Sequence, residues 1–102
     1  MFAGPAPVNP SLNDLMTAVL YRNSAGVNEL LALGKWPDRP DSVGTTPLMA
    51  AVMLGDAENA ERLLKAGANP NASARGGSTA VSLARERKDG AMTALLRRYG
   101  AP

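Results

Sequence analysis

The sequence contains no cysteine and no histidine. The first absence excludes disulfide bonds, cysteine nucleophiles and thiolate metal sites, while the second removes the commonest general base and metal ligand. The remaining carboxylate pairs, such as Asp38 with Asp41 and Glu58 with Glu61, fall in an expected loop or on an expected helix surface, away from any cleft. We therefore predict that the protein is not an enzyme and binds neither a metal ion nor a cofactor.

Aromatic residues and long hydrophobic runs are also scarce. The chain of 102 residues is 45% hydrophobic but has only one Trp, one Phe and two Tyr, which suits a single domain with a modest core. The longest apolar run, 47–55, is about half of the roughly 18 residues that a membrane span needs. Segment 1–8 lacks the basic residues that begin a secretion signal. We expect a cytoplasmic protein that spans no membrane, or a periplasmic or secreted one if a leader was removed.

The formal net charge is only +2, but it is unevenly distributed. Residues 75–102 carry six basic and two acidic side chains, whereas residues 1–74 carry five basic and seven acidic ones. Acidic residues interrupt the basic segment, and Tyr99 is its one aromatic residue, so the pattern does not favour nucleic acid as a partner. The sequence GGST at 76–79 lacks the lysine of a phosphate-binding loop and follows no expected strand.

The strongest positive signal is an internal repeat. The heptapeptide Thr46–Val52 recurs in weaker form once upstream and once downstream, and the apolar residues Leu15, Leu48 and Val81 are spaced 33 residues apart (48 − 15 and 81 − 48). A period of about 20 to 50 residues is typical of a solenoid, whose units stack because none can bury its apolar face alone. Function is then expected on a repeated surface and not in a deep pocket.

Each unit is predicted to contain a helix, a tight turn, a second helix and a loop. In the central unit, Thr46 suits an N-cap and Pro47 the first helical position. Gly55 is expected to end the first helix, Asp56 to cap the second, and Gly67 to end it in a left-handed conformation. Further caps are expected at Asn23, Ser24, Thr79 and Asp89, a hairpin-like turn at 75–77, and turn residues equivalent to Gly55 at Arg22 and Lys88.

Two motifs of the central unit, DxxGxTPLxxA at 41–51 and LLxxGAxxN at 63–71, resemble the ankyrin repeat. The resemblance extends more weakly over 13–101. It implies an all-α ankyrin-repeat solenoid of three stacked helix-turn-helix repeats with hairpin-like loops. The implied organisation is a Pro-rich tail at 1–12 and a domain at 13–102, with repeats at about 13–40, 41–73 and 74–102.

The resemblance also implies where a partner binds: at the last two residues of each first helix and at the tip of the preceding loop, on the concave side. These positions are Leu20, Tyr21, Ser42, Val43, Thr45, Met53, Leu54, Arg75, Ser78, Glu86 and Arg87. Four of them form a predicted apolar strip bordered by arginines, and an exposed apolar patch usually marks an interaction site. The alternative is that Met53 and Leu54 fill space between repeats. We interpret Trp36 as covering an edge of the core rather than as an anchor for a partner.

We expect a protein–protein interaction module, a rigid scaffold that binds another protein through its concave face and loop tips. Two alternatives remain open: an inhibitor or immunity-type protein that occludes an enzyme, and a regulatory ankyrin domain excised from a larger protein. A homodimer that covers part of the apolar strip is also open. The Ala- and Arg-rich composition suits a bacterial source.

Overall fold

The structure, a computed structural model, describes residues 15–34 and 36–101. These residues form six α-helices in three consecutive pairs. The helices are α2 (Leu15–Leu20), α3 (Ser24–Ala32), α4 (Pro47–Met53), α5 (Ala57–Lys65), α6 (Ala80–Glu86) and α7 (Gly90–Arg98). The predicted all-α array is confirmed, and the predicted tail at 1–12 lies outside the described residues.

None of the helices in the described part of the chain is long and apolar enough to cross a membrane.

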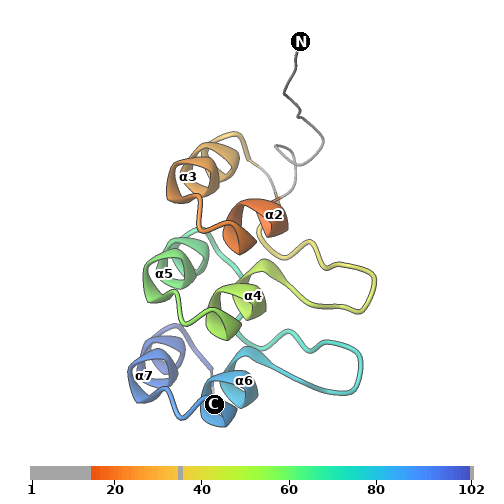
Figure 1. Ribbon diagram of the computed structural model, residues 1–102, viewed down its shortest axis with the longest axis vertical. Coiled ribbons are helices and arrows are strands. Elements are labelled where there is room, and N and C mark those ends of the chain that lie inside the picture. The colour runs from red at the N-terminus through yellow and green to blue at the C-terminus, as the bar shows by residue number, and fades with distance from the viewer. Residues whose placement is uncertain (1–14, 35, 102) are drawn as a thin grey trace.

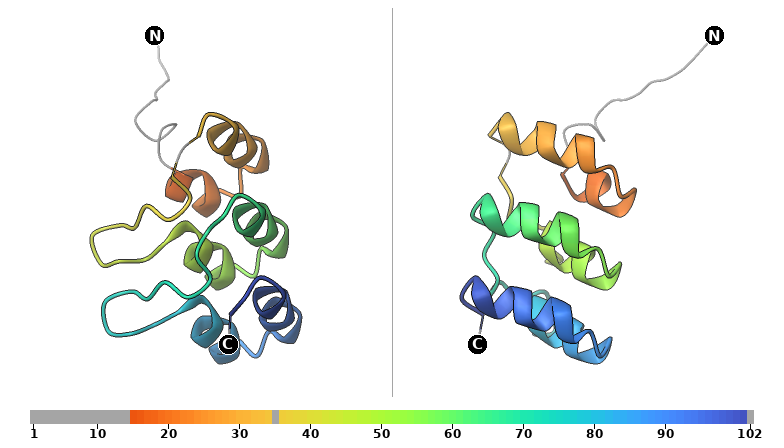
Figure 2. Two further views of the ribbon diagram at one scale, coloured as in Figure 1. Left: turned by 180° about the vertical axis from the view of Figure 1, so that it is seen from behind. Right: turned by 90° about the vertical axis from the view of Figure 1, so that its left-hand side faces the viewer.

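The three helical pairs stack on one another (Figure 1). The first helices of the pairs, α2, α4 and α6, form one row, and the second helices, α3, α5 and α7, form another (Figures 1 and 2). The loops that precede α4 and α6 project from the first row on the side away from the second row. Helix α4 packs against α2, α5 and α6 and has the most extensive contacts of any helix in the described residues.

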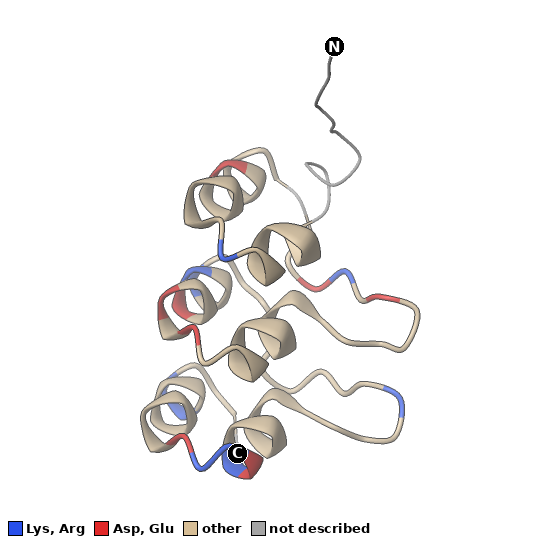
Figure 3. Cartoon of the chain, in the orientation of Figure 1, with Lys and Arg blue, Asp and Glu red and all other residues tan. Residues whose placement is uncertain are grey.

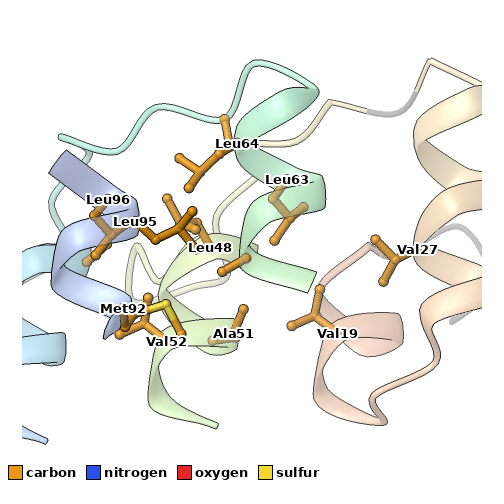
Figure 4. Packing of buried hydrophobic residues seen from close by; sticks show 14 of the residues in the cluster. Val19, Val27, Leu48, Ala51, Val52, Leu63, Leu64, Met92, Leu95 and Leu96 are labelled. Carbon is orange, nitrogen blue, oxygen red and sulfur yellow. The ribbon is translucent and has the colours of Figure 1, made fainter. Parts of the chain in front are cut away.

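One apolar core runs through the stack. Leu15, Leu48 and Val81 are 4%, 0% and 5% exposed, which confirms that the 33-residue spacing places them at equivalent buried positions. Six of the seven residues of α4 are buried, as a helix without a polar face requires. Figure 4 shows Leu48 amid the labelled leucines of α5 and α7, all within a single hydrophobic cluster.

Short polar side chains start the helices where the sequence predicts. Thr46 Oγ1 accepts a hydrogen bond from the backbone N–H of Met49 at 3.3 Å, and Asp56 accepts one from the backbone N–H of Asn59 at 3.1 Å. Each bond satisfies an N–H group that has no partner inside the helix. The prediction for Ser24 is wrong, because Asn23 caps α3 and Ser24 is its first residue. The same capping arrangement recurs at Asn23, Thr79 and Asp89.

The turns after the first helices all require a left-handed residue. Gly55 has φ +69°, and the residues predicted to replace it, Arg22 and Lys88, have φ +55° and +56°. The prediction for these three turn positions is therefore confirmed. An L side chain in this region costs about 1–2 kcal/mol, since its Cβ approaches the following carbonyl oxygen.

Replacing Lys88 with glycine is expected to raise the free energy of unfolding by about 0.5–1 kcal/mol, because relief of this strain outweighs the extra backbone entropy of unfolded glycine. Urea denaturation measures the change. The matched control is Lys65→Gly at the end of α5, which should lower stability by up to about 1 kcal/mol because that residue is helical. A destabilised Lys88→Gly protein would contradict the argument.

Both projecting loops are closed as hairpins. The backbone N–H of Asp41 donates to the carbonyl of Thr45 at 2.9 Å, and that of Ala74 donates to the carbonyl of Ser78 at 2.8 Å, one repeat later. In the first of these loops the Asp41 carboxylate also accepts from the backbone N–H groups of Val43 and Thr45. The hairpin-like turn predicted at 75–77 lies inside the second loop. Such bonds fix the loop tips relative to the helices that follow.

Candidate functional site

The two hairpin loops and the first-row helices α4 and α6 border a hollow of about 170 Å³. Five of the predicted partner-binding residues lie together around it. The full lining is Val43, Thr45, Met49, Met53, Ala74, Arg75, Ser78 and Leu83. The structure therefore gathers the loop tips and the end of α4 around one depression.

Most of this lining is apolar and part of it faces solvent. Met49 forms the deepest part, since only 1% of it is exposed, and Leu83 is half-buried. Met53 and Val43 are 43% and 48% exposed, so their side chains border the hollow and remain available for contact. An apolar depression with exposed walls can exclude water from a side chain that enters it.

The loops on either side of the hollow are joined directly. The backbone N–H of Arg75 donates to the Val43 carbonyl at 2.9 Å, and the Arg75 guanidinium is 3.4 Å from the Ser42 carbonyl oxygen that accepts from it. The backbone at Gly44 is so close to the second loop that a Cβ there would lie 3.2 Å from Ala74 Cα and Arg75 N. Predicted positions Ser42, Val43 and Arg75 are thus held in one unit.

Two arginines from flanking repeats bind the C-terminal end of α4. Arg87 Nη1 donates to the Met53 carbonyl at 2.8 Å, and Arg22 Nη2 donates to the Leu54 carbonyl at 2.7 Å. These carbonyls have no partner within the helix, and positive charge at a helix C-terminus is favourable. Gly55 leaves room for this arrangement, because a Cβ at that position would lie 2.8 Å from Arg87 Nη2.

The predicted residues at the end of α2 lie outside the lining of the hollow. Leu20 is 51% exposed and Tyr21 is 80% exposed. Leu54 is the residue of the central repeat that is equivalent to Tyr21, and it is half-buried. This burial agrees with the alternative that Leu54 fills space between repeats. Glu86 and Arg87, at the end of α6, are exposed and add charge to this side of the array.

Sequence reasoning missed three of the residues that line the hollow: Met49, Ala74 and Leu83. Met49 and Leu83 follow the same helical apolar pattern as the core, and nothing in that pattern distinguishes a core position from the bottom of a surface depression. The arginine bonds to Met53 and Leu54 were missed too, since they depend on side-chain conformations that a periodic pattern does not specify.

The interpretation of Trp36 as a cover for the core is wrong. Its side chain is 60% exposed, and the nearby Leu33 is 69% exposed. Trp36 follows the end of α3 in an irregular segment and does not belong to the hydrophobic cluster.

Charged groups elsewhere offer little chemistry. The ion pair found within residues 15–34 and 36–101 joins Arg62 to Glu58 at 3.3 Å along α5. Over the same ranges, no group of three or more His, Cys, Asp or Glu side chains could hold a metal ion.

Comparison with known proteins identifies the kind of molecule to which this surface belongs. No curated protein matches the chain in a sequence comparison. The family model for ankyrin repeats, which comprises three copies of the repeat, matches residues 15–101, a range that contains helices α2 to α7. Ankyrin repeats are generally protein–protein interaction modules, and they are typically not enzymes. With nearly all of its length matched by this model, the chain belongs to the ankyrin-repeat family.

Proposed function

We propose that the protein binds another protein through the surface formed by its loop tips and the ends of its first helices. The observation that carries this proposal is the hollow between the two loops, whose apolar walls at Val43 and Met53 are exposed. Leu20 and Tyr21, at the end of α2 in the first repeat, are exposed as well. Exposure of apolar surface to water is energetically unfavourable, and on many proteins an exposed apolar patch marks an interface.

Pre-organisation supports the same conclusion. The loops are joined by the Arg75–Val43 backbone bond, and the end of α4 is held by Arg22 and Arg87. A surface that is already fixed loses less conformational entropy when a partner binds. The chain would then act as a rigid scaffold, without a chemical step of its own.

A double substitution tests the proposed surface. Tyr21→Ala with Met53→Ala is expected to weaken binding of the natural partner by about tenfold or more, because tyrosine and methionine supply large contact areas at interfaces. The partner is first isolated by affinity capture from the native source, and its dissociation constant is then measured for each variant by calorimetry. Neither residue belongs to the core cluster, so the fold should persist.

The matched control changes exposed side chains on the opposite row of helices. The control combines Leu33→Ala, at the end of α3, with Lys65→Ala, at the end of α5. This double variant should leave the dissociation constant unchanged. Equal binding by both double variants would exclude the proposed surface. The identity of the captured protein separates the narrower alternatives: an enzyme whose activity falls on binding indicates an inhibitor or immunity-type protein, and a segment of the same polypeptide indicates a regulatory domain.

A further inference from the structure

The volume of the hollow limits what it can hold. Small-molecule sites in proteins usually measure about 300–1,000 Å³. The hollow measures about 170 Å³, which is close to the roughly 150 Å³ of a cavity that accommodates one benzene molecule. The space is therefore large enough for a single six-membered ring supplied by one side chain of a partner.

The lining favours an aromatic side chain over an aliphatic one. Met49 and Met53 both line the hollow, and methionine sulfur makes favourable contacts with aromatic rings. Arg75 lies in the same lining, and a guanidinium group attracts the face of an aromatic ring. An aliphatic side chain would gain from burial against Val43 and Leu83 but from neither of these two interactions.

The charges around the hollow favour an acidic neighbour for that ring. Within the described residues, Arg75 and Arg87 form hydrogen bonds with backbone carbonyls, and neither takes part in an ion pair with a carboxylate. Asp41, the nearest acidic residue along the first loop, directs its Oδ1 at the N–H groups of Val43 and Thr45.

On the α6 side of the hollow basic side chains outnumber acidic ones, whereas the loop before α4 carries Asp38 and Asp41 together with Arg39. Figure 3 shows a basic segment at the tip of the loop before α6, a loop whose one charged residue is Arg75. The same figure shows α4 without any charge. At the end of α6 the exposed residues Arg85, Arg87 and Lys88 outnumber Glu86. Complementary potentials determine which partners an interface accepts.

We propose that the hollow binds an aromatic side chain of a partner protein segment in which acidic residues flank the aromatic one. The ring enters between the two loops and contacts Met49 and Met53, while a flanking carboxylate pairs with the guanidinium of Arg75. This proposal rests on the proposed function and specifies the chemistry of the partner at that surface.

The experiment presents random linear peptides on phage to the full chain and then synthesises the enriched peptides. We expect an aromatic residue flanked by Asp or Glu. Substituting alanine for the aromatic residue of the peptide should weaken binding by about tenfold or more. Carbon-13 methyl spectra of the methionines should show shifts for Met49 and Met53 upon peptide addition, while Met92, which is buried in the core, should not shift.

Charge reversal tests the acidic part of the motif. Arg75→Glu should weaken the selected peptides by about tenfold or more. Arg98→Glu changes the net charge equally but lies in the last turn of α7, outside the hollow, and should have little effect. Both arginines are exposed, so neither variant should unfold.

Each other result overturns the proposal. Enriched peptides without an aromatic residue, peptides that bind Arg75→Glu as well as the original protein, or no enrichment at all would each exclude it. The proposed function fails separately, because it depends on the natural partner and on the Tyr21→Ala, Met53→Ala variant. A natural partner that is lost with that double variant, but that lacks an acidic aromatic segment, would sustain the function and refute this inference.

Discussion

Substitution of Leu48 with alanine is expected to lower the free energy of unfolding by about 2–5 kcal/mol, the range measured for buried leucines in well-packed cores. Leu48 is fully buried, and its helix packs against α2, α5 and α6 at once. Removing its isobutyl group leaves a cavity that three neighbouring helices border, and none of them can move into it without losing other contacts. The cost should therefore lie in the upper part of the range.

The consequence for the whole array is large, because domains of this size are typically stable by only about 5–15 kcal/mol. Each repeat contacts its neighbours and depends on them, so damage to the central repeat separates the outer two. We expect the thermal midpoint to fall by roughly 10 °C or more. Differential scanning calorimetry measures both the midpoint and the cooperativity of the transition.

Leu33→Ala is the matched control for Leu48→Ala, since it removes the same atoms from a side chain that is 69% exposed. It should change the free energy of unfolding by less than about 0.5 kcal/mol. If Leu48→Ala unfolds cooperatively near the midpoint of the unsubstituted protein, then the central helix does not have the structural importance assigned to it.

The features of the fold that the sequence predicts are those determined locally. The N-caps at Thr46 and Asp56 need only a side chain that reaches the next turn of the same helix, and the turn residues Arg22 and Lys88 follow from the position of Gly55 in the repeat. The repeat period then extends each local inference to the next unit. Local chemistry and periodicity together therefore predict the array.

The candidate site was less predictable because it depends on contacts between repeats. The hollow exists only where two loops and two helices meet, so its lining includes Met49 and Leu83, whose apolar character indicates only burial. Arg87 is a second example of what the sequence does not predict about the site. Its position at a helix end suggested a residue available to a partner, yet its guanidinium also holds the Met53 carbonyl.

The end of α4 therefore combines the exposed apolar side chain of Met53 with the guanidinium groups of Arg22 and Arg87. The arginines that fix this end are supplied by the neighbouring repeats, so the position of Met53 depends on all three units of the stack. Changes in the spacing between repeats would be transmitted to the hollow through these bonds and through the joined loops. The loop-to-loop contact is the point at which this dependence is easiest to test.

Gly44→Ala is expected to lower the free energy of unfolding by about 2–3 kcal/mol for two separate reasons. Gly44 has φ +84°, a conformation that strains an alanine, and the new Cβ would lie 3.2 Å from Ala74 Cα and Arg75 N. Those atoms belong to backbone and cannot rotate away. The loops must then separate, which stretches the bond from Arg75 N–H to the Val43 carbonyl and widens the hollow.

Gly76→Ala isolates the first of these reasons. Gly76 has φ +88°, nearly the same as Gly44, but a Cβ there would meet no atom within 4 Å. Its cost should be confined to the conformational strain of about 1–2 kcal/mol. The difference between the two variants, measured by urea denaturation, then reports the close approach of the loops. Equal losses of stability in the two variants would mean that the second loop moves away from the new Cβ without cost. The two loops would then not form one pre-organised unit.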